Sequence, residues 1–168
     1  MKLEYIKVGR IVNAHGIRGE LRVQPMEVDA SFLTRFKTFY LDGQPVHPTE
    51  NHVHKSLILM KLPGIEDMDA ALNMKGKILA IRRDDAHLGP DDCFDEELLG
   101  VEAYDADTGA LLGTVKSVEN YPAHKVYTIR GQREYLVPAV PGVFIQSLDL
   151  EQNRMEIHMM EGLATDEN

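Results

Sequence analysis

The chain has 168 residues, of which 43% are hydrophobic and 27% charged, and its formal net charge is −9. This length suits one large domain or two small ones, and the single cysteine, Cys93, excludes an internal disulfide and fits a reducing cytoplasm. We expect neither a signal peptide nor a membrane span, because the first residues hold a lysine and an acid, and no apolar run approaches the roughly 20 residues that a bilayer requires.

The two halves of the chain carry opposite charge. Residues 1–83 hold 13 Lys and Arg against 9 Asp and Glu, a net of +4, whereas residues 84–168 hold 5 against 18, a net of −13. The overall charge argues against a protein that binds nucleic acid with its whole surface. A basic first half could still face RNA phosphates, while the acidic second half either faces a basic protein or is a solvated domain.

The first half alternates short β-branched and apolar runs with turn signals, which is typical of a small β-barrel. Residues 31–36 suit one or two helical turns, and residues 66–74 form a clearer helix, which Asp67 caps and Gly76 ends. The predicted strands lie at residues 5–12, 20–24, 38–41, 57–62 together with Val53, and 77–82.

Residues 84–97 are acidic, contain Gly89-Pro90 and lack apolar periodicity, so they predict a linker. A second set of strands follows, separated by turns such as Asp107-Thr108-Gly109. We therefore expect a mainly all-β protein of two small β-barrel domains joined by a short linker. The second set of strands lies at residues 101–106, 111–118, 125–129, 134–137, 143–148 and 155–158. The expected domains are residues 1–83 and 98–164, with the linker at 84–97 and a tail at 165–168.

The opening hairpin is the best candidate for a binding site. Its turn contains Gly16 and Gly19, which tolerate positive φ, and its only acid among residues 10–22 is Glu20. Guanidinium groups crowded on a tight loop suit phosphate, because Arg presents a planar fork of donors. The basic side chains of this hairpin are Arg10, His15, Arg18 and Arg22.

Other constellations do not support catalysis or a metal. Three histidines, His47, His52 and His54, lie close together in sequence, but a zinc site needs three or four ligands and neither a second cysteine nor a paired acid set is present. No phosphate-binding loop or Gly-x-Ser-x-Gly elbow occurs, and acidic neighbours would raise the pKa of the Cys93 thiol. We expect a protein that is not an enzyme and needs no cofactor.

The hairpin also resembles the N-terminal signature of the ribosome maturation factor RimM family. In that family a Gly-Arg-Ile strand precedes a His-Gly-(Ile/Leu)-(Lys/Arg)-Gly-Glu turn, which residues 9–11 and 15–20 match position for position. The resemblance resumes, in the family order, at Leu98-Leu99-Gly100, Gly113-Thr114-Val115, residues 136–141 and Glu161-Gly162-Leu163. It implies an N-terminal barrel similar to translation-factor domains and a C-terminal barrel of the photosynthetic-reaction-centre (PRC) type.

The resemblance further implies a non-catalytic factor for ribosome biogenesis. Such a protein would bind the immature small ribosomal subunit at its head, contact ribosomal RNA and the small-subunit protein numbered nineteen, and assist RNA folding and processing. It would act in the cytoplasm as a monomer, without a membrane. The implied RNA-binding or ribosome-binding residues are those of the hairpin: Arg10, His15, Gly16, Arg18 and Arg22. For His15, direct contact and a purely structural role both remain open.

A second contact region is implied where the family typically holds two adjacent aromatic residues. Here Cys93 and Phe94 occupy those positions, so one ring remains. Phe94 and the rigid segment around Pro138 and Pro141 either contact a partner or close the core of the second barrel. The expected partner-binding residues are Phe94, Leu98, Val140 and Phe144. Two other functions stay open: a PRC-barrel interaction protein without a ribosomal role, and an enzyme that processes ribosomal RNA.

Overall fold

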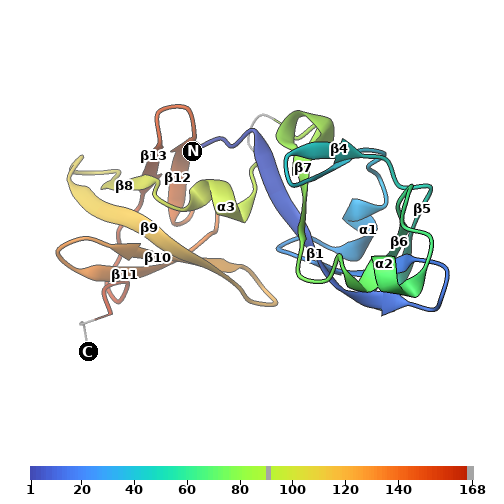
Figure 1. The fold of residues 1–168 in the computed structure, drawn as a ribbon. Helices are drawn as coiled ribbons and strands as arrows, with labels where there is room; N and C mark the ends of the chain where they lie inside the picture. The colour runs from blue at the N-terminus through green and yellow to red at the C-terminus, as the bar shows by residue number, and fades with distance from the viewer. Residues whose placement is uncertain (90–91, 166–168) are drawn as a thin grey trace. The chain divides into compact units, whose positions relative to one another are not determined.

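Figure 1 shows the computed structural model of the chain, which describes residues 1–89 and 92–165. The chain divides into two compact units. The N-terminal unit is Glu4–Leu88, and the C-terminal unit begins at Gly89 and also includes Met1–Leu3. The chain therefore passes from one unit to the other twice. Pro90 of the expected linker and residues 166–168 of the expected tail lie outside the described residues.

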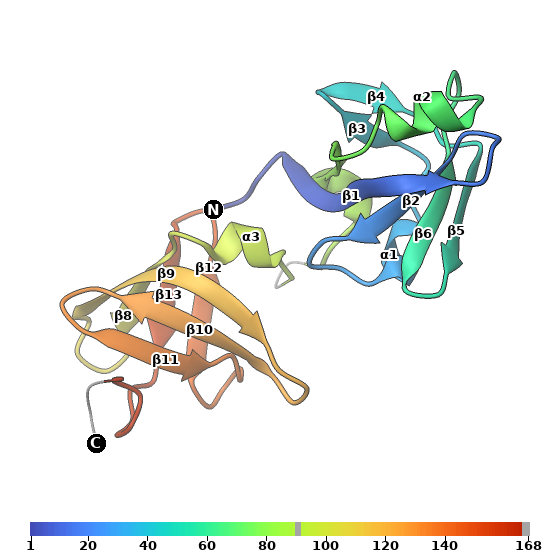
Figure 2. The same cartoon turned by 60° about the horizontal axis from the view of Figure 1, so that its bottom comes forward.

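The N-terminal unit is a curled sheet of antiparallel strands (Figures 1 and 2). Over the described residues the sheet has seven strands in the order β4-β3-β7-β1-β2-β6-β5. The long strand β1 lies near the middle of this order and pairs with β7 on one side and β2 on the other. The strands are β1 (Tyr5–His15), β2 (Glu20–Pro25), β3 (Phe39–Leu41), β4 (Gln44–Val46), β5 (Glu50–His54), β6 (Leu57–Lys61) and β7 (Ile78–Arg82).

Alternation of apolar and polar side chains builds the core of this unit. On β2, Leu21 and Val23 are fully buried, while Gln24 is exposed and Arg22 is half-buried. One face of the strand is thereby removed from water, which is the main stabilising contribution for a sheet of this kind.

Short helices pack against the strands of the N-terminal sheet. In α2 (Met68–Leu72), Asp67 accepts a hydrogen bond from the backbone N–H of Ala70 at 2.7 Å, as the sequence predicts for an N-cap. The segment at residues 31–36 contains a single helical turn, α1 (Ala30–Leu33), whose Leu33 is buried. A 3₁₀ helix, η1 (Arg83–Ala86), follows β7.

The C-terminal unit is also a curled sheet, in the order β11-β10-β9-β8-β13-β12. Neighbouring strands are antiparallel except for the parallel pair β8 and β13. Its core includes Val101, Ile129, Val137 and Met155, and the short helix α3 (Asp95–Leu98) lies at its start. The strands are β8 (Glu102–Asp105), β9 (Leu111–Asn120), β10 (Lys125–Arg130), β11 (Glu134–Pro138), β12 (Ile145–Asp149) and β13 (Arg154–Ile157).

The expected fold class, mainly all-β with two small barrels, is confirmed by these two curled sheets. The proposed linker at residues 84–97 contains more structure than its composition predicts. The 3₁₀ helix η1 overlaps its start, and α3 begins at Asp95, where Asp95 and Glu97 are buried. Glu97 is buried because its carboxylate accepts hydrogen bonds from the backbone N–H groups of Leu3 and Phe94, each at 3.0 Å.

Candidate nucleic-acid interface

The β1–β2 hairpin places its basic residues on the outer face of the N-terminal sheet. Arg10 pairs with Gln24, Asn13 with Arg22 and His15 with Glu20. Directly paired residues point to the same side of a sheet, and Ile11 opposite Val23 is buried on the other side. The predicted site residues Arg10, His15 and Arg22 are therefore brought onto one surface.

The turn between these strands is fixed by a close backbone contact. Gly19 has φ +91°, and a Cβ atom at this position would lie 2.2 Å from the carbonyl oxygen of Ile65. Gly16 also has positive φ, at +69°, but nothing lies within 4 Å of the position that its Cβ would take. Gly19 thus anchors the turn on the loop after β6, whereas Gly16 is an exposed turn residue.

His15 and Arg22 contact each other within the hairpin. The Nε and Nη2 atoms of Arg22 lie 3.3 and 3.1 Å from Nδ1 of His15. Because guanidinium only donates, Nδ1 is the acceptor, and the proton of the neutral ring is on Nε2. The ring of His54 lies 5.6 Å from that of His15. His15 therefore orders Arg22, which supports the structural role considered for it above and leaves direct contact untested.

The remaining hairpin cations face solvent. Arg18 forms an ion pair with Glu20 at 3.1 Å, and the Arg18 side chain is 80% exposed, so the pair is weak and readily exchanged for another anion. Arg10 is exposed on β1 and has no ion-pair partner among the residues that the structure describes. Arg10 and Arg18 are consequently the hairpin cations most available to phosphate.

The basic face extends beyond the hairpin cations to Lys7 on β1 and Arg82 on β7. Tyr5 pairs with Arg82, Lys7 with Ala80 and Arg10 with Ile78 across β1 and β7. A β-bulge between Lys7 and Gly9 adds one residue to β1, so that Lys7 and Arg10 share the outer face although they are three residues apart. Strict alternation would have placed them on opposite faces.

The negative charge of Asp42, which lies beside this face, is neutralised by a neighbouring cation. Asp42 forms an ion pair with Lys77 at 2.6 Å. The pKa of Arg82 is raised, chiefly by its attraction to the Tyr40 hydroxyl and also by Tyr5 and Glu4. The outer face of β7, β1 and β2 therefore carries an excess of positive charge.

The partner-binding residues expected in the C-terminal unit are not equivalent in the structure. Leu98 is only 2% exposed and belongs to the core, so its assignment to a contact surface is wrong: the turn of α3 directs it inward and leaves the next residue, Leu99, 48% exposed. Phe144 is half-buried against the same core. Phe94 and Val140 are half-buried.

Other apolar side chains of the C-terminal unit are more exposed than these four, and one of them, Val143, lies within the predicted segment between Val140 and Phe144. The exposed fractions of these side chains lie between 44% and 59%, and the residues are Leu99, Leu111, Leu136, Val143 and Met160. Leu136 and Val143 belong to β11 and the turn after it, close in sequence to Val140.

Residues 1–89 and 92–165 contain no group of three or more His, Cys, Asp or Glu side chains that could hold a metal ion. Over the same residues, none of the helices has the length and apolar character required to cross a bilayer.

Comparison with known proteins assigns the chain to a family. The model of the RimM N-terminal domain matches residues 6–86, and that of the RimM PRC barrel domain matches residues 95–163. A ribosome maturation factor RimM of Clostridioides difficile is 31% identical to this chain, and the alignment covers 96% of this chain and 97% of the relative. One of Symbiobacterium thermophilum is 33% identical, and the alignment covers 97% of this chain and 96% of the relative. The solution structure of the N-terminal domain of RimM from Thermus thermophilus covers 54% of this chain and 100% of its own, with 16% identity and a TM-score of 0.44. Because both domain models match in order and the relatives align over nearly the full chain, this protein belongs to the RimM family of ribosome maturation factors.

Proposed function

We propose that this protein is a non-catalytic assembly factor that binds the immature small ribosomal subunit at its head and assists the folding and processing of ribosomal RNA. The observation that carries the proposal is the basic outer face of β7, β1 and β2, with Lys7, Arg10 and Arg82 on one surface. Membership of the RimM family supports it, because relatives of this chain bear the name ribosome maturation factor.

In this proposal the two units divide the work according to their charge. The N-terminal unit contacts RNA phosphates, while the acidic C-terminal unit docks the basic small-subunit protein numbered nineteen. A balance of −13 over residues 84–168 would steer a positive partner by long-range attraction, screened over about 8–10 Å at ordinary ionic strength. Specificity would come from partly exposed apolar residues such as Phe94 and Val140.

The mechanism is that of a chaperone. The protein acts as a monomer in the cytoplasm and holds one arrangement of RNA and protein until later components bind, after which the mature subunit releases it. This requires no cofactor, and binding energy from many small contacts suffices.

The test is sedimentation of the full-length protein with purified small-subunit precursors and, separately, with mature small subunits. We expect sedimentation with the precursors only. The double variant Arg10→Ala/Arg18→Ala should bind more weakly and show a shallower dependence on salt, because fewer counterions are released. Arg22 is left in place because it contacts His15.

Lys116→Ala is the matched control, since Lys116 is an exposed cation of the C-terminal unit. Circular dichroism should show that every variant is folded. Sedimentation with neither particle would contradict the proposal and favour a PRC-barrel interaction protein without a ribosomal role. A chemical change in purified ribosomal RNA incubated with the protein alone would instead favour an enzyme.

A further inference from the structure

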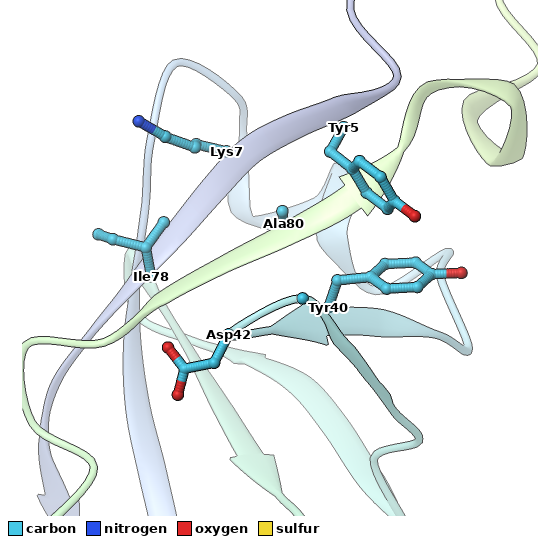
Figure 3. Close-up of a pocket in the computed structure, with 7 residues that line it drawn as sticks. Tyr5, Lys7, Tyr40, Asp42, Ile78 and Ala80 are labelled. Atoms are coloured by element: carbon cyan, nitrogen blue, oxygen red, sulfur yellow. The ribbon is translucent and has the colours of Figure 1, made fainter.

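A groove of about 370 Å³ lies on the outer face of the N-terminal sheet (Figure 3). The two tyrosines stand at one end, with Ala80 on the floor and Ile78, Lys7 and Asp42 toward the other end. The hydroxyl groups of both tyrosines point away from the floor. The residues that line the groove are Tyr5, Lys7, Tyr40, Asp42, Gly43, Ile78 and Ala80.

The groove exists because a small residue lies between large ones. Ala80 on β7 pairs with Lys7 on β1 and with Tyr40 on β3. Neighbouring strands are only about 4.8 Å apart, so a methyl group between two long side chains leaves a depression. The rings of Tyr5 and Tyr40 meet edge to face with centroids 5.0 Å apart and planes at 69°.

The tyrosines of the groove are not needed to fill the core. Tyr5 is 44% exposed, and Tyr40 is only partly buried. Two aromatic rings held together on an outer face expose apolar surface to water, which is unfavourable for folding. Contiguous exposed apolar surface of this kind is typical of an interaction site. The walls thus offer aromatic surface to a flat ligand.

The surroundings of the groove are positive. Lys7 of β1 lies in its wall, and Arg10 lies further along β1. Arg82 of β7 is paired with Tyr5 of β1. Neither Lys7 nor Arg10 has an ion-pair partner within the described parts of the chain. The one carboxylate in the lining, Asp42, is already paired with Lys77. An anion carrying a flat aromatic group fits this combination best.

We propose that the groove receives one unpaired nucleotide of RNA, with its base stacked against the tyrosine pair above Ala80 and its neighbouring phosphates on Lys7 and Arg82. Proteins read single-stranded RNA by stacking splayed bases on aromatic side chains beside a positive track for the backbone. Bases inside a duplex are paired and stacked, so a duplex could offer only phosphates here. The inference rests on the proposed function, since an incompletely folded ribosomal RNA exposes unpaired bases.

Binding of a fluorescently labelled single-stranded RNA to the full-length protein tests the proposal, with the same RNA in duplex form for comparison. Tyr40→Ala should weaken single-strand binding roughly 5- to 150-fold, the range typical of one stacked base, and Tyr40→Phe should restore it. Ala80→Leu should weaken it as well, because it fills the groove while leaving the rings and charges in place. Lys7→Gln should instead lower the salt dependence for single-stranded and duplex RNA alike.

Tyr121→Ala is the matched control, because Tyr121 is a 53% exposed tyrosine of the C-terminal unit. Circular dichroism of each variant, together with the Tyr40→Phe result, separates loss of the groove from loss of the fold. Unchanged single-strand affinity in both Tyr40→Ala and Ala80→Leu would overturn the proposal. Equal affinity of the wild type for single strand and duplex would overturn it too. So would the finding that the groove binds a peptide and not RNA.

The same variants in the sedimentation assay keep the two proposals apart. If the wild type sediments with subunit precursors while the groove variants bind single-stranded RNA normally, the nucleotide site is wrong and the assembly function stands. If the wild type does not sediment with precursors, the assembly function is wrong whatever the groove variants show.

Discussion

Gly19 and Gly16 provide a matched pair that measures how firmly the basic hairpin is held. Both have positive φ, so alanine at either position costs about 1–2 kcal/mol, partly offset by the lower entropy of the unfolded chain. Only at Gly19 would the new Cβ also meet backbone, at 2.2 Å from the oxygen and 2.7 Å from the carbon of the Ile65 carbonyl group. The two substitutions therefore differ by a single steric contact.

The Ile65 carbonyl has little room to move. The ammonium group of Lys61 donates a hydrogen bond to it and also pairs with Glu66 at 3.2 Å. Forcing a methyl group into such a site costs about 1–3 kcal/mol beyond the φ penalty. We expect Gly16→Ala to destabilise the hairpin by about 1 kcal/mol and Gly19→Ala by about 3 kcal/mol.

Hydrogen exchange followed by mass spectrometry measures this difference within one unit of the protein. A gap of about 2 kcal/mol corresponds to a roughly 30-fold faster exchange of the β1 and β2 amides in Gly19→Ala than in Gly16→Ala. Peptides of the C-terminal unit serve as the internal reference and should not change. Equal acceleration in the two variants would refute the claim that contact with Ile65 fixes the turn.

Three further predictions concern the C-terminal unit and its boundary. Glu97→Ala should lower the free energy of unfolding by about 2–5 kcal/mol in urea denaturation, because the buried carboxylate accepts hydrogen bonds from the N–H groups of Leu3 and Phe94. Glu97→Gln should be intermediate, and wild-type stability in both variants would contradict this. Burial, followed by the nearby Cys93 and Asp95, raises the pKa of Tyr127 to about 12 from the ordinary 10.0. Because the folded state favours the neutral phenol, this contribution to stability is present below pH 10 and is lost as the pH rises toward 12. Hydrogen bonds to Glu102 and Glu119 also raise the pKa of Tyr104 and Tyr121, so ultraviolet titration of Tyr127→Phe should lack specifically the tyrosine that ionises near pH 12. Limited proteolysis should cut first within residues 84–97 and leave two resistant fragments, whereas early cleavage within residues 100–150 would count against this boundary.

The strands that could be predicted from sequence are those whose local pattern decides their structure. Alternation with turn residues located most strands of both sheets, and the cap at Asp67 located α2, because both signals act over a few residues. The edge strand β4 was missed, and only Val53 of the opposite edge strand, β5, was predicted to be in a strand. Strand β4 contains Pro45, which reads as a break in a strand but is tolerated at the edge of a sheet.

Elements that depend on distant contacts could not be predicted. The helix α3 lies in an acidic segment that resembles a solvated linker, yet Glu97 is buried because it binds the N–H of Leu3, 94 residues earlier. Likewise, nothing local distinguishes Leu98 from Leu99, and only the turn of α3 decides which of them enters the core.

The candidate site was predicted in part. The hairpin cations were found because they are adjacent in sequence, and the register of β1 with β2 brings them together. Lys7, Tyr5 and Tyr40 were not connected with them. Their grouping depends on the bulge in β1 and on the pairing of β3 with β7, neither of which leaves a local signal in the sequence.

The double passage of the chain makes the N-terminal unit an inserted domain in topological terms. Its two ends emerge from neighbouring strands: Tyr5 pairs with Arg82, and the N–H of Arg83 donates to the carbonyl of Glu4 at 2.9 Å. Insertions of this kind are tolerated because such adjacent ends add little strain to the host. A C-terminal half produced on its own would retain buried Glu97 but lose Leu3, its hydrogen-bond donor. Excising residues 4–88 and joining residue 3 to residue 89 through a linker would instead keep both segments of the C-terminal unit, and with them the Leu3 donor, in one chain.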